Sequence, residues 1–472
     1  MQQFNPETSK RVYLIAICGT GMTALAGMLK SLGYDVRGSD QNVYPPMSTF
    51  LDDLNIPYHV GFDEKHLVPP PDLVVIGNAM SRGNPEVEAV LERKLHYVSL
   101  PFALREFFIR GKYSCVVAGT HGKTTTSALL AWVLEKAGRD PGFFIGGILE
   151  NFERGYKLGK GSVFVSEGDE YDSAFFDKGS KFFHYLPDLV VLNNIEFDHA
   201  DIFNSLDEIE TAFKRLINII PRNGYLIAGW DDPIVRKLTE KAFSNVITFG
   251  LADDADWRAR NFSTASTSTY FDVYHKSELV GHFSAPLFGE HMIKNCLAVI
   301  AAGSVLGLSK NEIAAGLATF KNVRRRLQFK GEVRNIRVFD DFAHHPTAVQ
   351  ATIEGLRSRF PRQRIWALYE PRSASSKRKI FEDDYVEALK LADCVVLTPL
   401  YMPEKVPAKE RISIDNIVNA LNQTQTPTWM LPANSEMLDF LKTNLESGDV
   451  VLFMSNGDFH GIPEKLLTVI QN

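Results

Sequence analysis

The sequence predicts an α/β protein with three domains. At 472 residues it is too long for one ordinary hydrophobic core, and its length corresponds to about three domains. Short apolar runs alternate with helical patterns, and two of these runs, at residues 12–17 and 115–118, end in glycine-bearing turns that open helices. We therefore expect a Rossmann-like domain over residues 1–109, a P-loop domain over 110–322 and a second Rossmann-like domain over 323–472.

The composition excludes several classes of protein. Hydrophobic residues make up 45% of the chain and charged residues 23%, as in a soluble globular protein, and the net charge of −6 argues against binding to nucleic acid or to a membrane surface. We expect neither a membrane span nor a signal peptide. The four cysteines are widely spaced without a CxxC pair, which indicates reduced thiols in a cytoplasmic protein: Cys18, Cys115, Cys296 and Cys394.

The turn after residues 115–118 carries the strongest chemical signal. It ends in Gly-Lys-Thr-Thr, and helical periodicity follows from Ser127. Backbone N–H groups at a helix start bind phosphate, a lysine reaches the β- and γ-phosphates, and a following hydroxyl is a ligand for Mg²⁺. The first glycine of the full Walker pattern is replaced by Val117, yet the strand-turn-helix context disfavours a chance match. We assign ATP contacts to Gly119, Thr120, His121, Gly122, Lys123, Thr124 and Thr125.

Two further strand ends supply candidate Mg²⁺ ligands beside Thr124. Glu167 directly follows the apolar run 163–166, where a Walker-B acid would lie. His199 follows the run 189–192, and we assign it to a second Mg²⁺, although a histidine at a strand end is equally compatible with a structural hydrogen bond. The neighbouring acids Asp169, Glu170 and Asp172 are expected to cap or solvate the turn after Glu167.

A later helix offers contacts for the nucleotide base. Residues 256–287 alternate with a strand period and predict an antiparallel excursion. Gly289 then opens an apolar helix, on which Asn295 follows His291 by one turn, so both side chains can face the base. A capping histidine and a solvent-facing asparagine fit the same spacing.

The N-terminal domain contains a GxGxxA turn followed by an acid about twenty residues later, which is typical of nucleotide-diphosphate binding. The acid is Asp40, and read literally the motif indicates NAD. We expect this domain to bind a nucleotide-linked substrate. Asn78 follows another buried strand and is included, although ordinary turn chemistry also places asparagine there. The expected substrate contacts are Gly19, Thr20, Gly21, Met22, Ser39, Asp40 and Asn78.

The C-terminal domain begins with a basic cluster and continues with strands that end in polar residues. Arg326 lies at the domain junction, where it could neutralise phosphoryl charge, and a solvated linker is the alternative. Two acids and two histidines follow the strand at 338–339, at an edge where open α/β sheets bind ligands. The candidates there are Asp340, Asp341 and His344 for the nucleotide and phosphoryl group, and Arg372, Ser455 and Asn456 for the second substrate.

Taken together, these stretches resemble the Mur ligases, the ATP-dependent amide-forming ligases of peptidoglycan synthesis. The similarity rests on residues 119–125, Glu167 with residues 196–199, His291 with Asn295 and Arg326, and residues 340–346. It implies ATP and Mg²⁺ as cofactors and roles in catalysis for Lys123, Glu167, His199, Arg326 and His344.

Finer segments are similar to the branch of the family that attaches a recycled tripeptide to UDP-N-acetylmuramate. They are residues 42–49, 175–178, 198–203, 370–373 and 454–457. The resemblance implies UDP-N-acetylmuramate and L-Ala-γ-D-Glu-meso-diaminopimelate as substrates. We expect a monomer or a homodimer. One position departs from the family pattern: Met292 replaces the usual asparagine after the helix-opening histidine. Lys214 is a candidate for the carbamylated lysine that some family members carry, but we do not place it in the site.

Three alternatives remain open. The first is the sister activity, which adds free L-alanine instead of the tripeptide. The third domain decides between these two activities, because a tripeptide with extra carboxylates needs room and cations that L-alanine does not. Arg372 and Lys377 are candidate partners for those carboxylates. The second is an NAD-dependent dehydrogenase, which leaves the P-loop unexplained. The third is a non-catalytic nucleotide-binding regulator.

Overall fold

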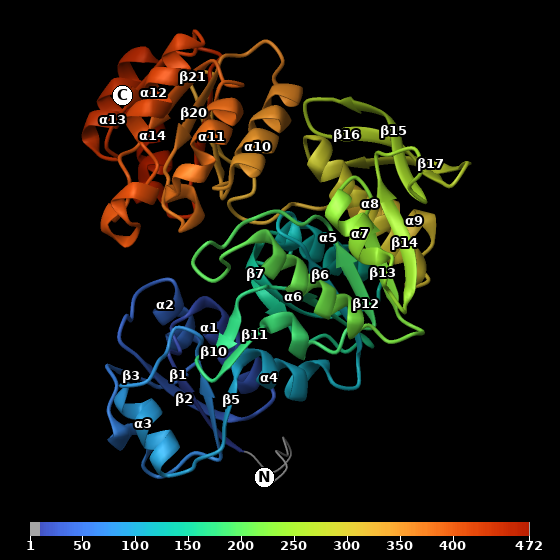
Figure 1. Cartoon of the computed structure of the whole chain (residues 1–472), viewed down its shortest axis with the longest axis vertical. Coiled ribbons are helices and arrows are strands. Elements are labelled where there is room, and N and C mark those ends of the chain that lie inside the picture. The colour runs from blue at the N-terminus through green and yellow to red at the C-terminus, as the bar shows by residue number, and fades with distance from the viewer. Residues whose placement is uncertain (1–9, 472) are drawn as a thin grey trace.

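The computed structural model describes residues 10–471, which form three α/β units, each built on its own sheet. In Figure 1 the N-terminal unit is blue, the central unit runs from teal through green to yellow, and the C-terminal unit is orange to red. The sheets fall within the predicted ranges 1–109, 110–322 and 323–472, whose limits stay a prediction. The predicted fold class is confirmed.

The N-terminal sheet is fully parallel, with strand order β3-β2-β1-β4-β5. Its first strand ends at Ile15, two residues earlier than predicted, because Ala16 adopts a positive φ and turns the chain toward α1. The elements are β1 (Arg11–Ile15), α1 (Thr20–Ser31), β2 (Asp35–Asp40), α2 (Met47–Asp53), β3 (Tyr58–Val60), β4 (Leu73–Ile76), α3 (Pro85–Glu92), β5 (Tyr97–Ser99) and α4 (Leu100–Leu104).

The central sheet has ten strands in the order β17-β16-β15-β14-β13-β12-β6-β9-β7-β8. The predicted antiparallel excursion is confirmed as β15–β17. The elements are β6 (Tyr113–Ala118), α5 (Lys123–Lys136), β7 (Gly142–Leu149), β8 (Arg154–Lys157), β9 (Val163–Glu167), β10 (Asp172–Ala174), β11 (Asp177–Ser180), β12 (Leu189–Leu192), α6 (Leu206–Asn218), β13 (Tyr225–Gly229), α7 (Pro233–Thr239), β14 (Asn245–Gly250), β15 (Trp257–Thr264), β16 (Thr269–His275), β17 (Glu278–Ala285), α8 (Glu290–Val305) and α9 (Lys310–Ala318).

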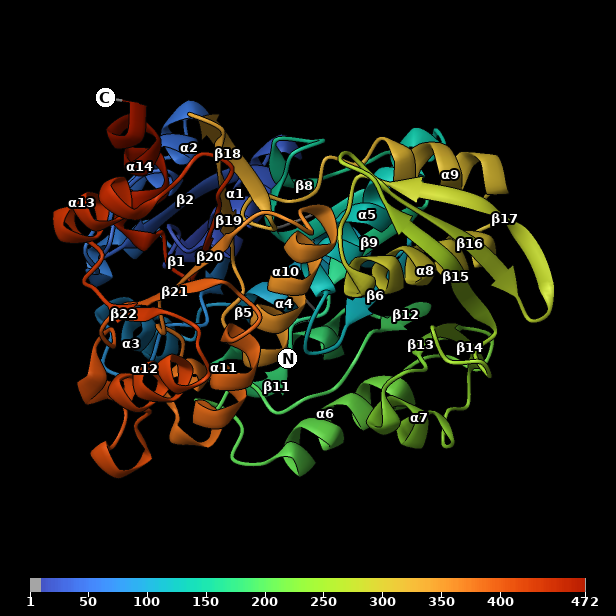
Figure 2. The ribbon, with the colours of Figure 1, turned by 90° about the horizontal axis from the view of Figure 1, so that it is seen from above.

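The C-terminal sheet has the order β18-β19-β23-β20-β21-β22, with β18 antiparallel to β19 at one edge. Seen from above, α10 faces the central unit, where it contacts α8 (Figure 2). The elements are β18 (Gln328–Val333), β19 (Ile336–Asp341), α10 (Pro346–Arg359), β20 (Ile365–Tyr369), α11 (Glu382–Leu389), β21 (Cys394–Leu397), α12 (Ile414–Gln423), β22 (Thr428–Met430), α13 (Ser435–Asn444), β23 (Val450–Met454) and α14 (Ile462–Gln471).

Side-chain alternation explains why the central strands are apolar throughout. Cys115 and Val117 of β6 pack on the face covered by α5 and α8. Val116 and Ala118 pack on the opposite face, together with α6 and side chains of the N-terminal unit. A parallel strand buried on both faces needs apolar residues at every position. The unbroken run at 115–118 is therefore the sequence signature of a two-sided core.

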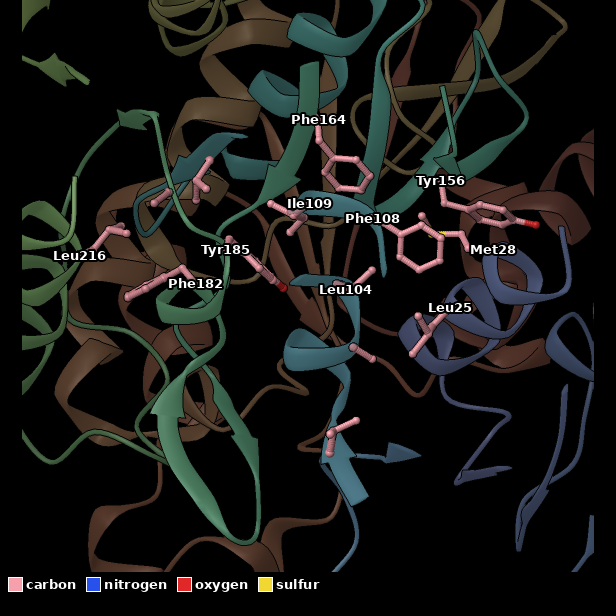
Figure 3. Close-up of a cluster of buried hydrophobic side chains, with 14 of the residues drawn as sticks. Leu25, Met28, Leu104, Phe108, Ile109, Tyr156, Phe164, Phe182, Tyr185 and Leu216 are labelled. Carbon is pink, nitrogen blue, oxygen red and sulfur yellow. The ribbon is translucent and has the colours of Figure 1, made fainter. Parts of the chain in front are cut away.

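One continuous core joins the N-terminal and central units. Figure 3 shows Leu25 and Met28 of α1 on the same cluster as Phe108, Tyr156 and Phe164. Phe108 and Tyr156 are each 7% exposed, and Phe164 is fully buried. Because apolar burial is the main source of stability, these two units should move as one body.

Phe108→Ala should lower the free energy of unfolding by about 3–5 kcal/mol, since it removes a large buried side chain from this shared core. Urea denaturation followed by circular dichroism measures the change. The matched control is Phe243→Ala, because Phe243 is 73% exposed and its loss should change stability by less than about 0.5 kcal/mol. Equal stabilities for the two variants would contradict the shared core.

Candidate active site

The P-loop runs from the end of β6 into α5, as predicted, but the helix begins at Lys123, four residues before the predicted periodicity. Gly119 and Gly122 have φ values of 125° and 80°, which favour glycine. A Cβ on Gly122 would lie 2.7 Å from Asn295 Oδ1, and one on Gly119 would lie 2.9 Å from the carbonyl oxygen of Asn194. Both glycines are therefore required by backbone shape and by close neighbours.

Lys123 lies folded over its own loop. Its Nζ donates to the carbonyl oxygens of Gly119 and Thr120 at 2.7 and 3.1 Å and is 2.9 Å from a carboxylate oxygen of Glu170. Burial opposes a charged lysine, but the nearby carboxylates of Glu170 and Asp169 raise the pKa of Lys123 above its usual value. The lysine is thus held charged at the mouth of the loop, where a phosphate would contact it.

Thr124, in the first turn of α5, and Glu167, at the end of β9, meet in the arrangement expected of a magnesium site. Thr124 Oγ1 donates to Glu167 Oε1 at 2.8 Å, and the N–H of Gly146 donates to Glu167 Oε2 at 2.7 Å. A hydroxyl and a carboxylate at the end of a P-loop sheet are oxygen ligands of the kind Mg²⁺ prefers. The two predicted residues therefore fit the metal.

His199 lies at the same sheet edge but is already bonded at both ring nitrogens. Its Nε2 is 2.9 Å from Glu170 Oε1 and its Nδ1 is 2.9 Å from the Tyr171 hydroxyl. Burial would lower the pKa of His199, but Glu170 raises it above the ordinary value. Its predicted role as a ligand of a second Mg²⁺ remains a prediction.

The expectation that Glu170 caps a turn is wrong. Its side chain is 2% exposed and joins Lys123 to His199. Asp169 likewise pairs with Lys181 at 2.5 Å rather than serving only as a turn acid. Sequence alone does not indicate this, because Asp169, Glu170 and Asp172 lie within four consecutive residues after a strand and look alike until their partners are placed. The structure thus adds Glu170 to the site.

Arg326 and the loop after β19 bring the C-terminal unit to the P-loop. Arg326 Nη2 lies 3.5 Å from Thr124 Oγ1, and its guanidinium lies 5.1 Å from the ring centre of Phe342. Asp341 accepts from the N–H groups of Leu327 and Ala343 at 2.6 and 2.7 Å. A solvated linker is therefore excluded for Arg326, which lines the same cavity as the P-loop.

Asp340 and His344, the other predicted residues of this loop, lie differently. Asp340 pairs with Arg325 at 3.1 Å and does not line the cavity. His344 does line it, and its Nε2 lies 4.0 Å from Asp198 Oδ2. Burial lowers the pKa of His344, so the ring is uncharged at neutral pH. Asp340 thus supports the loop, while Asp341 and His344 are placed to contact a ligand.

The cavity between the central and C-terminal units measures about 640 Å³ and also receives the predicted base contacts. His291, Met292 and Asn295 line it from the first turns of α8. Burial, with Lys294 nearby, lowers the pKa of His291 to about 4, so this ring is neutral. Asn295 is 7% exposed and its amide contacts only Met292 Sδ among the hydrogen bonds of the described residues, at 3.7 Å. Its amide is available to a base.

Two predicted contacts of the N-terminal unit are used by the protein itself. Asp40 accepts from the N–H groups of Cys18 and Asn42 at 2.9 and 3.0 Å, which fixes the turn after β1. Ser39 is fully buried and donates to Glu86 at 2.5 Å, so the prediction that Ser39 contacts a substrate directly is wrong. Asn78 is exposed just beyond β4.

The other predicted N-terminal contacts form the start of α1, which faces the central unit. They are Gly19, which is the N-cap, and Thr20, Gly21 and Met22 in the first turn. A Cβ on Gly21 would lie 3.2 Å from Leu100 Cδ1 and 3.6 Å from the Phe144 ring. Because Leu100 and Phe144 crowd Gly21, a nucleotide diphosphate can contact this helix start only through its backbone groups.

The segments after β20 and β23 bring Arg372, Ser455 and Asn456 together around the buried carboxylate of Glu370. Arg372 stacks on Tyr401 at 4.0 Å from the ring centre, and its Nη1 is buried without a hydrogen-bond partner. Ser455 donates to Glu370 at 2.5 Å, and Asn456 Oδ1 is also buried without a partner. Such unpaired polar atoms are costly unless a ligand meets them. These residues are therefore placed to bind a polar substrate.

Lys377 is buried, at 4% exposure, and contacts Tyr401, the residue on which Arg372 stacks. Its Nζ donates to the carbonyl oxygen of Tyr401 at 3.4 Å. Burial lowers the pKa of Lys377, and the charge of Lys405 adds to the effect. Lys377 is therefore not a solvated surface charge. Lys214, by contrast, is exposed on α6 and does not line the cavity, so it stays outside the site.

Comparison with known proteins identifies the class of enzyme that this fold and site define. Residues 11–112 match the description "Mur ligase family, catalytic domain", residues 117–303 match "Mur ligase middle domain", and residues 325–457 match "Mur ligase, glutamate ligase domain". The chain belongs to the Mur ligase family.

Individual relatives narrow the comparison within this family. The chain is 42% identical over 460 residues to the UDP-N-acetylmuramate–L-alanyl-γ-D-glutamyl-meso-2,6-diaminoheptandioate ligase of Escherichia coli, with 97% of each chain covered. It is 32% identical to a UDP-N-acetylmuramate–L-alanine ligase of Clostridium acetobutylicum, with 98% of each covered. A murein peptide ligase from Psychrobacter arcticus has a similar structure, with a TM-score of 0.72, 36% identity and 98% coverage of both chains. Among the described residues, no helix is long and apolar enough to cross a membrane.

Proposed function

We propose that this enzyme joins L-Ala-γ-D-Glu-meso-diaminopimelate to the lactoyl carboxylate of UDP-N-acetylmuramate, with ATP and Mg²⁺, in the recycling of peptidoglycan. The similarity to the E. coli tripeptide ligase supports it, because it extends over 97% of both chains and exceeds the 32% identity to the L-alanine ligase. The single structural observation that carries the proposal is the cavity in which the P-loop, Glu167, Arg326 and His344 meet.

The reaction needs activation because an amine does not displace hydroxide from a carboxylate at neutral pH. A carboxylate oxygen of the sugar substrate attacks the γ-phosphorus of ATP, the bond to ADP breaks, and an acyl phosphate forms. The tripeptide amine, having lost a proton, then attacks the acyl carbon, and phosphate leaves. The protein contributes position and charge, which are the main terms in phosphoryl transfer.

Several of the predicted site residues have a place in this scheme. We assign Lys123 and Arg326 to the charge on the phosphoryl group, and Thr124 and Glu167 to Mg²⁺, which when bound neutralises phosphate charge. Asn295 and His291 face the adenine. The start of α1 takes the diphosphate of the sugar nucleotide, where backbone N–H groups favour anions.

The tautomer of His344 suits it to accept a proton from the amine of the tripeptide. Its Nδ1 lies 3.0 Å from the carbonyl oxygen of Phe342, and a carbonyl only accepts, so Nδ1 carries the proton. The neutral ring then presents a lone pair at Nε2. A lone pair cannot donate to a phosphoryl oxygen, but it can accept a proton from the substrate ammonium and so release the free amine that attacks. We therefore move His344 from the transferring group to that step.

Omission assays test the reaction class. Phosphate release should require ATP, Mg²⁺, UDP-N-acetylmuramate and the tripeptide together, and leaving out any one should reduce it to background. Release of phosphate without the tripeptide amine, at the full rate, would show an ATPase rather than a ligase and would overturn the proposal.

Lys377→Met should raise the KM for the tripeptide about tenfold with little change in kcat, because we assign this buried ammonium to a carboxylate of the peptide and one charge-assisted hydrogen bond is worth about 1.5 kcal/mol or more. Steady-state kinetics with varied tripeptide measures it. The control is Lys405→Met, an exposed neighbour in the same loop region, which should leave KM within about twofold. An unchanged KM in Lys377→Met would remove this residue from the peptide site.

A further inference from the structure

A second group of potential metal ligands lies where the central and C-terminal units touch. His121 comes from the P-loop, Glu196 from the loop after β12, and His345 from the N-cap of α10. One ligand atom from each of the three lies within 4.8 Å of the other two. None of the three is among the residues assigned to Mg²⁺.

The hydrogen bonds of His345 fix which ring nitrogen holds its proton. Its Nε2 lies 3.2 Å from the carbonyl oxygen of Phe197, which can only accept, so Nε2 donates. Burial, with His121 nearby, lowers the pKa of His345 to about 4, and the ring is neutral at physiological pH. Nδ1 therefore carries a bare lone pair.

That lone pair is buried and faces an anion. His345 is 5% exposed, its Nδ1 has no hydrogen-bond partner, and Glu196 Oε2 is 3.6 Å away. Burial would raise the pKa of Glu196, but its hydrogen bond to His121 contributes to lowering it to about 2, so it is a carboxylate. The lone pair of buried His345 and the carboxylate oxygen of Glu196, whose side chain is 34% exposed, repel each other at this distance, and a cation between them would turn this repulsion into two bonds.

Two of the three spacings between ligand atoms are close to those of a tetrahedral metal centre. Bonds of about 2.0–2.1 Å to nitrogen and oxygen place tetrahedral ligand atoms about 3.3–3.4 Å apart. Glu196 Oε2 is 3.2 Å from His121 Nε2 and 3.6 Å from His345 Nδ1. A proton that His121 Nε2 holds in its hydrogen bond to Glu196 is released when a metal takes its place, because a ligating nitrogen needs a free lone pair. The same oxygen accepts from Thr347 Oγ1 at 2.7 Å, the kind of outer hydrogen bond that orients a ligating carboxylate.

We propose that His121 Nε2, Glu196 Oε2 and His345 Nδ1 form a binding site for a divalent transition metal of the Zn²⁺, Co²⁺ and Ni²⁺ class. Two imidazoles and one carboxylate select such ions over Mg²⁺, which prefers oxygen. Three protein ligands leave a fourth position open toward the cavity that all three residues line. A bound metal would fasten helix α10 of the C-terminal unit to the P-loop.

The test is a titration of tag-free, EDTA-treated, full-length enzyme with CoCl₂ in excess Mg²⁺, so that the oxygen site is filled. We expect one Co²⁺ per chain with the intense visible bands of low-coordinate, imidazole-bound cobalt. His345→Ala and Glu196→Gln should each weaken binding at least about tenfold, the range seen when a metal site loses a partner. Glu196→Gln keeps the side-chain shape, so it decides the matter if His345→Ala folds poorly.

Two matched controls separate this site from others. Glu167→Ala removes the acid assigned to Mg²⁺, and His184→Ala removes a histidine that pairs with Asp177 elsewhere. Both should bind Co²⁺ as the unaltered enzyme does. Absence of the cobalt bands, bands unchanged by Glu196→Gln, or bands lost in Glu167→Ala would each overturn the proposal.

Discussion

Lys123→Ala should reduce ADP formation by about a thousandfold or more. Its Nζ is the cation at the mouth of the P-loop, within 3.1 Å of two loop carbonyl oxygens. A cation preorganised for the transferring phosphoryl group contributes about a thousandfold or more to phosphoryl transfer. A coupled assay of ADP production, with all substrates saturating, measures the loss.

The same change also has a structural cost, which must be separated from the catalytic one. Glu170 is 2% exposed and would lose its partner, and breaking a buried ion pair costs about 3–5 kcal/mol. The double variant Lys123→Ala/Glu170→Gln removes the uncompensated charge. We expect it to regain stability in urea denaturation and to remain inactive. A double variant that turned over at the unaltered rate would exclude Lys123 from catalysis.

Glu167→Gln should lower kcat about a hundredfold and raise the Mg²⁺ concentration needed for half-maximal activity about tenfold. Both carboxylate oxygens of Glu167 accept, one from Thr124 and one from the N–H of Gly146. An amide has one accepting oxygen, so its NH₂ group would face a donor. The loss of negative charge also weakens the attraction to a divalent cation, which stabilises transferring phosphate by several kcal/mol.

Titration of activity with MgCl₂ measures this change. The matched control is Asp172→Asn in the same acidic segment, because Asp172 pairs with Lys178 at 2.8 Å, away from Thr124. It should keep the Mg²⁺ dependence of the unaltered enzyme. If Glu167→Gln and Asp172→Asn behaved alike, the metal would not lie at Glu167.

Local signals account for the parts of the site that the sequence could predict. The P-loop, Glu167 and the base-facing helix α8 each depend on one strand, one turn or one helix turn, and such patterns lie within a few residues. The central strands were predictable for the same reason, because apolar runs of four to six residues are sufficient to indicate buried parallel strands.

Contacts between distant segments account for what the sequence did not predict. Glu170 belongs to the site only because it contacts Lys123, 47 positions away in the chain. The same carboxylate also contacts His199, and no sequence spacing indicates either contact. Ser39 resembled a ligand contact at a strand end until its hydroxyl was found on Glu86. The packing of Phe108 on both α1 and β8 is equally invisible, because one apolar residue in a helical pattern does not specify its partners.

The preference of the enzyme for the tripeptide as its amine substrate is tested most directly by one competition experiment. The enzyme is incubated with ATP, Mg²⁺, UDP-N-acetylmuramate and equal concentrations of L-Ala-γ-D-Glu-meso-diaminopimelate and L-alanine, and the products are separated by mass. We expect the UDP-N-acetylmuramyl tripeptide as the dominant product. A dominant UDP-N-acetylmuramyl-L-alanine product would contradict the account and assign the enzyme to the first step of peptide addition.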